Sequence, residues 1–235
     1  DGDLRPEPRF HGSEDDPLDL GRTELERELF GTHPLAGPVA GTAHSVATMR
    51  TAALRGHYRR YYTPDNYVIT VVGNASHRAV VSSVTRAFGL ADAPVRAPKI
   101  SKPPTAPRTR KARVGKAFEQ VNLLRAHSGP ARGDERRYSM AVLHTILGGG
   151  MSSRLFQEVR ERRSLAYSVN AFRASYSDAG VFGVHAGCAP EKLDQTREVI
   201  EAVLREVASA GLSADEVDAA KNQVKGQIVL DLEDP

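Results

Sequence analysis

The sequence is poor in the features that mark membrane proteins and proteins of oxidising compartments. Its 235 residues contain one cysteine, Cys188, so no internal disulfide can form and a reducing, cytoplasmic setting is expected. No stretch approaches the roughly 18 consecutive apolar residues that span a bilayer, so no membrane association is expected. The polar start of the sequence, residues 1–12, is interrupted by prolines and does not resemble a secretory signal.

The net charge is also small, at +3. The basic excess is local: seven Lys or Arg residues and no acid fall between Arg96 and Arg113. Such a stretch could bind nucleic acid, and binding of that kind would depend steeply on salt. It contains no aromatic residue and is stiffened or bordered by prolines, so we predict a solvated linker and no nucleic-acid partner. The prolines are Pro94, Pro98, Pro103, Pro104 and Pro107.

Before this linker, the pattern predicts helices around one strand. Asp16 and Pro17 are typical of a helix start, and the helix is expected to run to Phe30 and end at Gly31. A second helix is predicted from about Ser45 to Tyr61. The uninterrupted β-branched run from Tyr67 to Val72 predicts a buried strand. A helix with Val80, Val81, Val84 and Phe88 on one face follows.

After the linker, residues 118–124 predict a strand and residues 134–147 a helix that Gly148-Gly149-Gly150 ends. A short helix from Ser153 to about Arg163 precedes two strands, 166–175 and 180–186, that should pair as a hairpin. An amphipathic helix around Val199–Val207 follows, and Ser213 with Glu216 predicts a capping box for a last helix. This order predicts an α+β fold, with helices on one face of an antiparallel or mixed sheet.

Three segments carry a resemblance to a known family. The first is Glu14-Asp15-Asp16-Pro17 followed by Phe30–Leu35 and Gly41-Thr42. The second is Tyr62–Asn66 leading into Tyr67–Asn74, and the third is Leu147–Gln157 through Arg160 to Leu165–Ser168. In this order and spacing they resemble the insulinase, pitrilysin and mitochondrial processing peptidase family of zinc metallopeptidases.

The resemblance implies two homologous α+β halves that face each other around a peptide-degrading chamber. It divides this sequence into residues 1–92, the rear of the first, zinc-bearing half; a linker, 93–115; and residues 116–235, most of the second half. Both halves would be incomplete. The acidic Glu14–Pro17 and Glu233-Asp234-Pro235 would mark equivalent points of the two halves.

In the family, zinc is held at H-x-x-E-H by two histidines, with a further glutamate downstream, and the intervening glutamate activates the metal-bound water. None of this chain's eight histidines has a partner four residues away. The third ligand would lie just before Glu14, where Glu7 is the nearby acid, flanked by Pro6 and Pro8. We therefore expect no catalytic residue and no metal ligand in this chain, and Glu7 is not assigned as one.

Arg160 and Tyr167 match a pair that the family places opposite the zinc. Attack on an amide carbonyl develops negative charge on its oxygen, which a guanidinium or a phenol hydroxyl can stabilise. The alternative reading is an exposed arginine on a helix and a half-buried tyrosine at a strand start. The resemblance favours Arg160 and Tyr167 as substrate-binding and transition-state-stabilising residues.

Three other features have plainer interpretations. The glycine triplet lacks the spacing of either common phosphate-binding loop, so it predicts a helix end. His33, beside Pro34, is expected to be a solvated residue in a surface turn. Cys188, at a strand end, is expected to be small and buried rather than a nucleophile.

The leading hypothesis is a zinc-dependent metalloendopeptidase whose chain, as it stands here, does not hydrolyse peptides. The alternative is a non-catalytic, peptide-binding partner subunit of a two-chain processing peptidase. Both imply peptide substrates, zinc at the level of the family, and a possible homodimer or paired homologous subunit. An H-x-x-E-H motif encoded upstream in frame would favour the first.

Overall fold

The computed structural model describes residues 16–63, 66–88, 110–115 and 119–233. They belong to two compact units. Unit 1 takes in the described residues up to Val39 and those from 110 onward, and unit 2 those from Ala40 to 88.

Unit 1 is built on a three-stranded antiparallel sheet with the strand order β1-β3-β2. The strands are β1 (Val121–Ser128), β2 (Ser168–Ser175) and β3 (Gly180–Cys188). In the central strand, β3, every residue is buried, and His185 pairs with Leu124 on one side and Asn170 on the other. The predicted hairpin is confirmed. The first predicted strand is also present, at 121–128 rather than 118–124, and residue 118 lies outside the described residues.

One face of the sheet carries the larger hydrophobic core. It is covered by α5 (Arg136–Gly148), the single wide turn η3 (Phe156–Glu161) and α6 (Leu193–Ala210), which the short η4 (Pro190–Lys192) precedes. Alternate residues of β2 and β3 point into this core, as expected for a strand with period two. The core includes Leu147, Leu155, Val159, Val169, Ala171, Phe182, Val184, Ala186, Ile200 and Val203.

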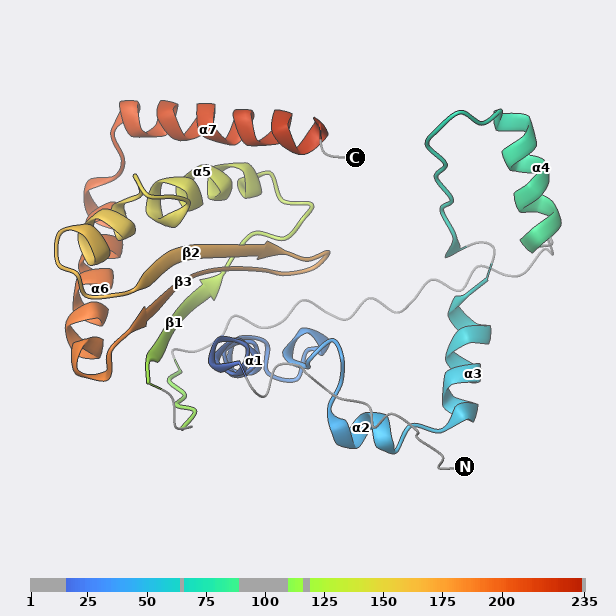
Figure 1. Cartoon of the computed structure of the whole chain (residues 1–235), viewed down its shortest axis with the longest axis horizontal. Helices are drawn as coiled ribbons and strands as arrows, with labels where there is room; N and C mark the ends of the chain where they lie inside the picture. Colours follow the sequence, from blue (N-terminus) through green and yellow to red (C-terminus); the bar gives the residue numbers. More distant parts are fainter. Residues whose placement is uncertain (1–15, 64–65, 89–109, 116–118, 234–235) are drawn as a thin grey trace, which may run out of the picture. The chain divides into compact units, whose positions relative to one another are not determined.

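The last helix, α7 (Ala214–Glu233), packs on α5 and forms a further layer over this core (Figure 1). Its start is fixed by the predicted capping box. The Glu216 amide donates to Ser213 Oγ at 3.2 Å, and the Ser213 amide donates to Glu216 Oε2 at 3.0 Å. Two backbone donors at the helix start are thereby satisfied, which is the function of this motif.

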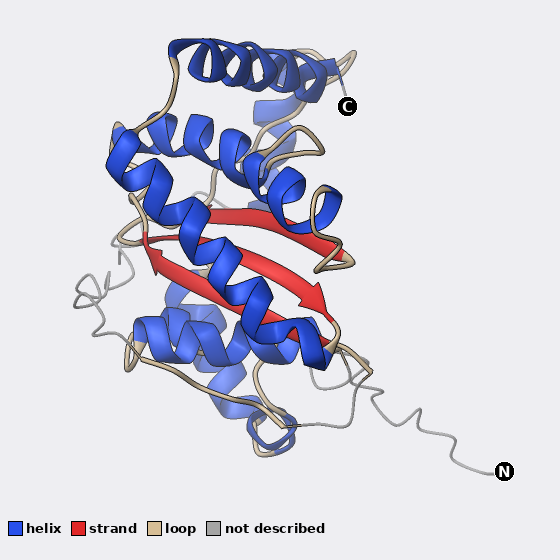
Figure 2. Ribbon diagram, turned by 90° about the vertical axis from the view of Figure 1, so that its left-hand side faces the viewer, coloured by secondary structure: helices blue, strands red, loops and turns tan. Residues whose placement is uncertain are grey.

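The opposite face of the sheet is covered by α1 (Pro17–Phe30) and η1 (Pro34–Ala36). Figure 2 shows the strands between helices. As predicted, Asp16 caps α1 by accepting from the Leu18 amide at 2.7 Å, and Gly31 ends it with φ 59°. Leu29 and Phe30 are buried against Val181. The α+β class is confirmed, and helices cover both faces of the sheet rather than one.

Unit 2 contains α2 (Ala43–Ala47), α3 (Thr51–Tyr61) and α4 (His77–Phe88). The single helix predicted from Ser45 to Tyr61 is wrong, because the chain is interrupted at residues 48–50. Thr48 Oγ1 donates to the His44 carbonyl at 2.8 Å and the Met49 amide donates to the Val46 carbonyl at 3.2 Å. This tight turn ends α2, and Arg50 is extended before α3 begins.

The strand predicted at Tyr67–Val72 is absent from the described chain. Its residues belong to no described sheet, and their side chains are exposed. A strand forms only where another strand satisfies its backbone groups, and the described residues offer none to this segment. The run is apolar and β-branched, but its predicted burial does not occur among the described residues.

The compact units do not follow the division of the chain at residues 92 and 115. Helix α1 precedes the predicted linker and yet packs on β1, which follows it. The assignment of 1–92, 93–115 and 116–235 to successive parts of two homologous halves remains a prediction. In the described residues, no helix combines the length and apolarity needed to cross a membrane.

Candidate functional site

The segment from Gly148 to Tyr167, called here the η3 corner, carries both residues that the sequence singled out. It begins where α5 ends: Gly149 is the C-cap, and its amide donates to the Thr145 carbonyl. Gly148 lies so close to β2 that a Cβ there would come within 2.2 Å of the Ala171 nitrogen. The glycine triplet thus ends the helix, as predicted, and Gly148 in addition lets α5 approach the sheet.

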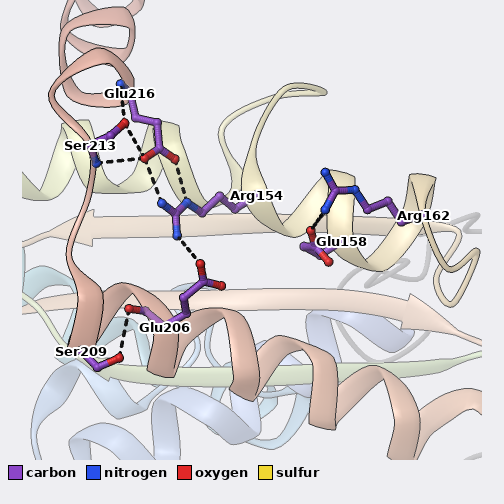
Figure 3. Close-up of polar contacts among 7 residues, drawn as sticks. All are labelled: Arg154, Glu158, Arg162, Glu206, Ser209, Ser213 and Glu216. Carbon is purple, nitrogen blue, oxygen red and sulfur yellow. Dashed lines mark hydrogen bonds and ion pairs between the residues drawn. The ribbon is translucent and has the colours of Figure 1, made fainter.

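Arg154 fastens the η3 corner to the start of α7 (Figure 3). Its Nε and Nη2 donate to the two carboxylate oxygens of Glu216 at 2.7 and 2.9 Å, and Nη1 lies 3.5 Å from Glu206 Oε1. Paired donors facing paired acceptors make this a strong, directional ion pair. These bonds, together with those from Ser213, lower the pKa of Glu216 to about 2.

The turn η3 places Arg160 on the surface. It is a wide turn, because the Arg162 amide donates to the carbonyl of Gln157, five residues earlier, at 2.9 Å. Single turns of this kind are frequent at functional sites. Val159 is completely buried beneath it, and the exposed Arg160 guanidinium lies over the Phe156 ring, 5.0 Å from its centroid.

The neighbouring arginines are engaged, whereas Arg160 is not. Arg162 and Arg163 both pair with Glu158, and Arg163 also donates to the Glu158 carbonyl at 2.8 Å. The hydrogen bond from Arg163 is the main reason that the pKa of Glu158 is lowered. Within the described part of the chain, Arg160 forms no ion pair. Of the three arginines, it is the one whose charge is available to a ligand.

Tyr167 follows a constrained turn. Ser164 has φ 48°, an unusual value for a residue with a side chain, and its carbonyl accepts from Lys192 Nζ at 2.8 Å. Leu165 is buried, while Tyr167 is 69% exposed. The Tyr167 amide donates to the Gly187 carbonyl at 2.8 Å, so its backbone is held near the end of β3 although its ring is exposed.

The structure therefore places Arg160 and Tyr167 at the two ends of one turn, both exposed. A groove of about 340 Å³ lies elsewhere on unit 1, between α6 and the strands β1 and β3, and Arg125 and Phe182 are among its lining residues. Neither Arg160 nor Tyr167 lines it. Their joint role in binding a substrate remains a prediction.

His33 is not solvated, which corrects the sequence interpretation. Its side chain is 8% exposed; Nε2 lies 3.1 Å from Asp178 Oδ2, and Nδ1 accepts from the Leu35 amide at 3.2 Å. Since Nδ1 is an acceptor, Nε2 carries the proton and donates to the carboxylate. The pair attaches the turn before η1 to the β2–β3 hairpin. No sequence signal could have indicated it, because Asp178 is remote in the chain.

His185 is a second buried histidine that sequence reasoning missed. On the α1 side of the sheet its Nδ1 lies 3.1 Å from Asn170 Oδ1 and its Nε2 2.8 Å from Asn122 Oδ1. Burial, with a smaller effect of Arg22, lowers its pKa. A neutral ring donates from one nitrogen only and accepts at the other. One of the two asparagines therefore presents its NH₂ group to the ring nitrogen that carries no proton. The three side chains link all three strands.

The described histidines do not fit a zinc site. Zinc in a protein takes tetrahedral nitrogen, sulfur or oxygen ligands. Both ring nitrogens of His33 and His185 have partners, and His144 Nε2 lies 3.0 Å from the Ala171 carbonyl. Within the described ranges, no three His, Cys, Asp or Glu side chains gather as metal ligands would. Glu7 lies outside those ranges.

Cys188 is completely buried, as expected, and burial raises the pKa of its thiol. A raised pKa leaves little thiolate, so this residue has the character of a packing side chain. Of the basic stretch from Arg96 to Arg113, residues 96–109 lie outside the described residues. Arg110, which is described, pairs with Glu28 on α1 at 3.3 Å.

Comparison with known proteins places this architecture in a class of peptidases. Residues 49–224 match the family model described as the peptidase M16 inactive domain. The chain is 40% identical to an uncharacterized zinc protease of Streptomyces coelicolor and 38% identical to one of Bacillus subtilis, in both cases over 94% of its own length. It covers 50% and 53% of those proteins, so it spans about half the length of these relatives.

A solved structure agrees with the sequence match. The crystal structure of a peptidase M16 inactive domain from Pseudomonas fluorescens superposes with a TM-score of 0.81 at 29% identity, covering 91% of this chain and 52% of that one. This chain therefore belongs to the peptidase M16 family, and most of it corresponds to the family's inactive domain. The resemblance found in the sequence is confirmed at that level.

Proposed function

We propose that this chain is the substrate-contacting, non-catalytic portion of an M16 zinc endopeptidase. Arg160 and Tyr167 would donate hydrogen bonds to the backbone carbonyls of a peptide whose cleavage depends on zinc held elsewhere. The observation that carries the proposal is the contrast within the η3 corner: Arg162 and Arg163 are engaged by Glu158, while Arg160 is exposed and without an ion pair among the described residues.

The chemistry explains why these two side chains would act together. The guanidinium is permanently charged and presents several donors, and the phenol adds a neutral donor from the same turn. Both can stabilise the negative charge that develops on a carbonyl oxygen under attack. The bonds that hold the turn, from Lys192 to Ser164 and from Tyr167 to Gly187, would keep their backbone positions fixed during binding.

The test is peptide binding without hydrolysis. The chain should bind fluorescein-labelled, unfolded casein in an anisotropy titration. Arg160→Ala should weaken this binding about tenfold and Tyr167→Phe about threefold, because a charged donor contributes more than a neutral one. Arg162→Ala is the matched control and should change little, since its partner is Glu158. Equal effects of Arg160→Ala and Arg162→Ala would contradict the proposal.

Hydrolysis by the chain alone is the second part of the test. None of its histidines occurs in H-x-x-E-H, so we expect no casein cleavage with or without added zinc. Chelator-sensitive turnover by this chain would refute a non-catalytic role.

The match to an inactive domain also fits a non-catalytic partner subunit of a two-chain processing peptidase. In that case the same residues would bind peptide while a separate polypeptide supplied the zinc. The two possibilities differ in whether an H-x-x-E-H motif is encoded in the same reading frame.

A further inference from the structure

The turn between Arg160 and Tyr167 depends on one residue in an unfavourable conformation. Ser164, at φ 48°, is the one described residue other than glycine with a positive φ. Where α1 and α6 end, the residue with positive φ is a glycine, Gly31 at 59° and Gly211 at 77°. A side chain in the left-handed region crowds the neighbouring backbone, and glycine avoids this cost. Ser164 therefore needs a contact from elsewhere in the fold to remain in this conformation.

The conformation of Ser164 determines how the two donors are spaced. The Ser164 amide donates to the Arg160 carbonyl at 2.9 Å. The Leu165 amide donates to the Val159 carbonyl, also at 2.9 Å, and both of these residues are buried. This nested pair of bonds closes the turn as a Schellman motif closes a helix, one residue wider, and it needs a left-handed residue at Ser164. At negative φ these bonds could not form, and the path from Arg160 to Tyr167 would change.

Lys192 supplies the contact that holds Ser164. It lies in η4, a single turn in which the Lys192 amide donates to the Ala189 carbonyl at 3.0 Å. From there its ammonium donates to the Ser164 carbonyl at 2.8 Å. A hydrogen bond from a charged donor is stronger than one between neutral groups, so it resists rotation of the Ser164 backbone. The two residues are 28 positions apart in the sequence, and their bond joins the start of α6 to the η3 corner.

We propose that Lys192 is a positioning residue, which holds Ser164 in its left-handed conformation and thereby keeps Arg160 and Tyr167 spaced to bind one peptide. The inference rests on the proposed function for the role of the two donors, whereas the bond from Lys192 is a property of the turn itself. Lys192 acts through Ser164 alone. A glycine at position 164 should therefore make the ammonium dispensable, because glycine adopts a positive φ without crowding.

The first experiment measures binding of fluorescein-labelled, unfolded casein by the full chain. Lys192→Met keeps the length of the side chain but removes the ammonium, and it should weaken binding about threefold, because the turn that presents both donors becomes less populated. Lys221→Met is the matched control. It also removes one positive charge, from an exposed pair with Asp218 at 3.2 Å, and should change binding little. Equal effects of the two variants would overturn the proposal, since binding would then report only net charge.

Two double variants separate positioning from a general loss of stability. Ser164→Gly in the Lys192→Met background should restore the binding of the parent chain. In the Arg160→Ala background Lys192→Met should have little further effect, because the main residue that it positions is gone. A general loss of stability would not depend on Arg160. The proposal is overturned if Ser164→Gly fails to rescue binding, or if Lys192→Met costs a further threefold in the Arg160→Ala background.

Hydrogen exchange at Leu165 tests the turn without casein. Its amide is held by the Val159 carbonyl, so Lys192→Met should speed its exchange about fivefold and Ser164→Gly should reverse this effect. Unchanged exchange in Lys192→Met would contradict the inference. If exchange responds as expected while Arg160→Ala leaves casein binding unaffected, Lys192 holds the turn and the proposed function is wrong. If Arg160→Ala weakens binding while Lys192→Met changes neither binding nor exchange, only this inference is wrong.

Discussion

His33 Nε2 lies 3.1 Å from Asp178 Oδ2, although 145 residues separate them in the sequence. The pair connects the turn that follows α1 to the tip of the β2–β3 hairpin, and both side chains are almost completely buried. Together with the packing of Phe30 and Val181 in one apolar cluster, the pair holds α1 and the turn after it to the sheet.

Removing this contact should destabilise unit 1. His33→Ala leaves the Asp178 carboxylate and the Leu35 amide without a partner, so we expect a loss of about 1–3 kcal/mol in the free energy of unfolding, measured with urea. His44→Ala, at an exposed position on α2, is the control and should cost far less. If the double variant with Asp178→Ala lost the full sum of the single losses, the two residues would not be coupled.

Arg154→Ala should be more costly than the removal of an exposed arginine. It breaks two short hydrogen bonds to Glu216 and loosens the η3 corner from α7. We expect a loss of about 1.5–3 kcal/mol. Arg197→Ala, which breaks an exposed pair with Asp194 at 3.0 Å, should cost at most about 0.5 kcal/mol. Arg154→Lys should rescue little, because one ammonium cannot bond both carboxylate oxygens in the same plane.

The Glu216 carboxylate makes part of this stability depend on acid. Its pKa is about 2 in the folded chain and near 4.3 for an unperturbed glutamate, so its contribution is complete above about 4.3 and is lost as pH falls toward 2. Glu216→Gln should flatten the decrease in unfolding free energy across this range. An unchanged slope would show that the carboxylate is not held by Arg154 in solution.

Mild acid should act through His185. Its pKa is lowered by burial, so the folded chain holds it neutral while the unfolded chain protonates it near pH 6.5. Stability that is present above about 6.5 should therefore decrease as pH falls below it. His144 and His127, whose pKa values burial also lowers, add to this slope. His185→Gln should remove part of it in urea titrations, and a slope identical to that of the parent chain would contradict the assignment.

The glycine triplet provides a test of packing at the η3 corner. Gly148→Ala would place a Cβ 2.2 Å from the Ala171 nitrogen, so α5 would have to move from the sheet, at a cost of about 1–3 kcal/mol. Gly150→Ala meets nothing closer than 3.8 Å, to Gln223 Nε2, and should be tolerated. Equal melting temperatures for the two variants would show that the close approach is not required.

Local chemistry was readable from the sequence. The cap of α1 at Asp16, the capping box at Ser213 and Glu216, and the helix end at Gly149 each depend on residues a few positions apart. The hairpin followed from two apolar runs with a short turn between them. The order of the strands and longer helices in unit 1 was accordingly predicted, with errors at their ends, whereas the short turns η1 and η4 were not predicted.

Apart from the local break between α2 and α3 at residues 48–50, the predictions that failed depended on residues far apart in the chain. The run Tyr67–Val72 has strand composition, but a strand also needs a neighbour, and composition does not reveal whether the neighbour is present. His33 was read as solvated because Asp178 is distant in the sequence. The coverage of the second sheet face by α1 was missed for the same reason. At the η3 corner, the family resemblance indicated Arg160, but only the structure shows that Glu158 engages its neighbours.

The position of α1 has a practical consequence for dividing the protein. A polypeptide started in the proline-rich stretch would retain all three strands but lose the helix that shields Phe172, Val181 and Leu124. Such a fragment would expose the apolar face of the sheet that α1 covers, and it should aggregate when expressed. Unit 1 is thus formed by two stretches that are separate in the sequence. A stable fragment has to contain residues 16–36 together with the sheet that they cover.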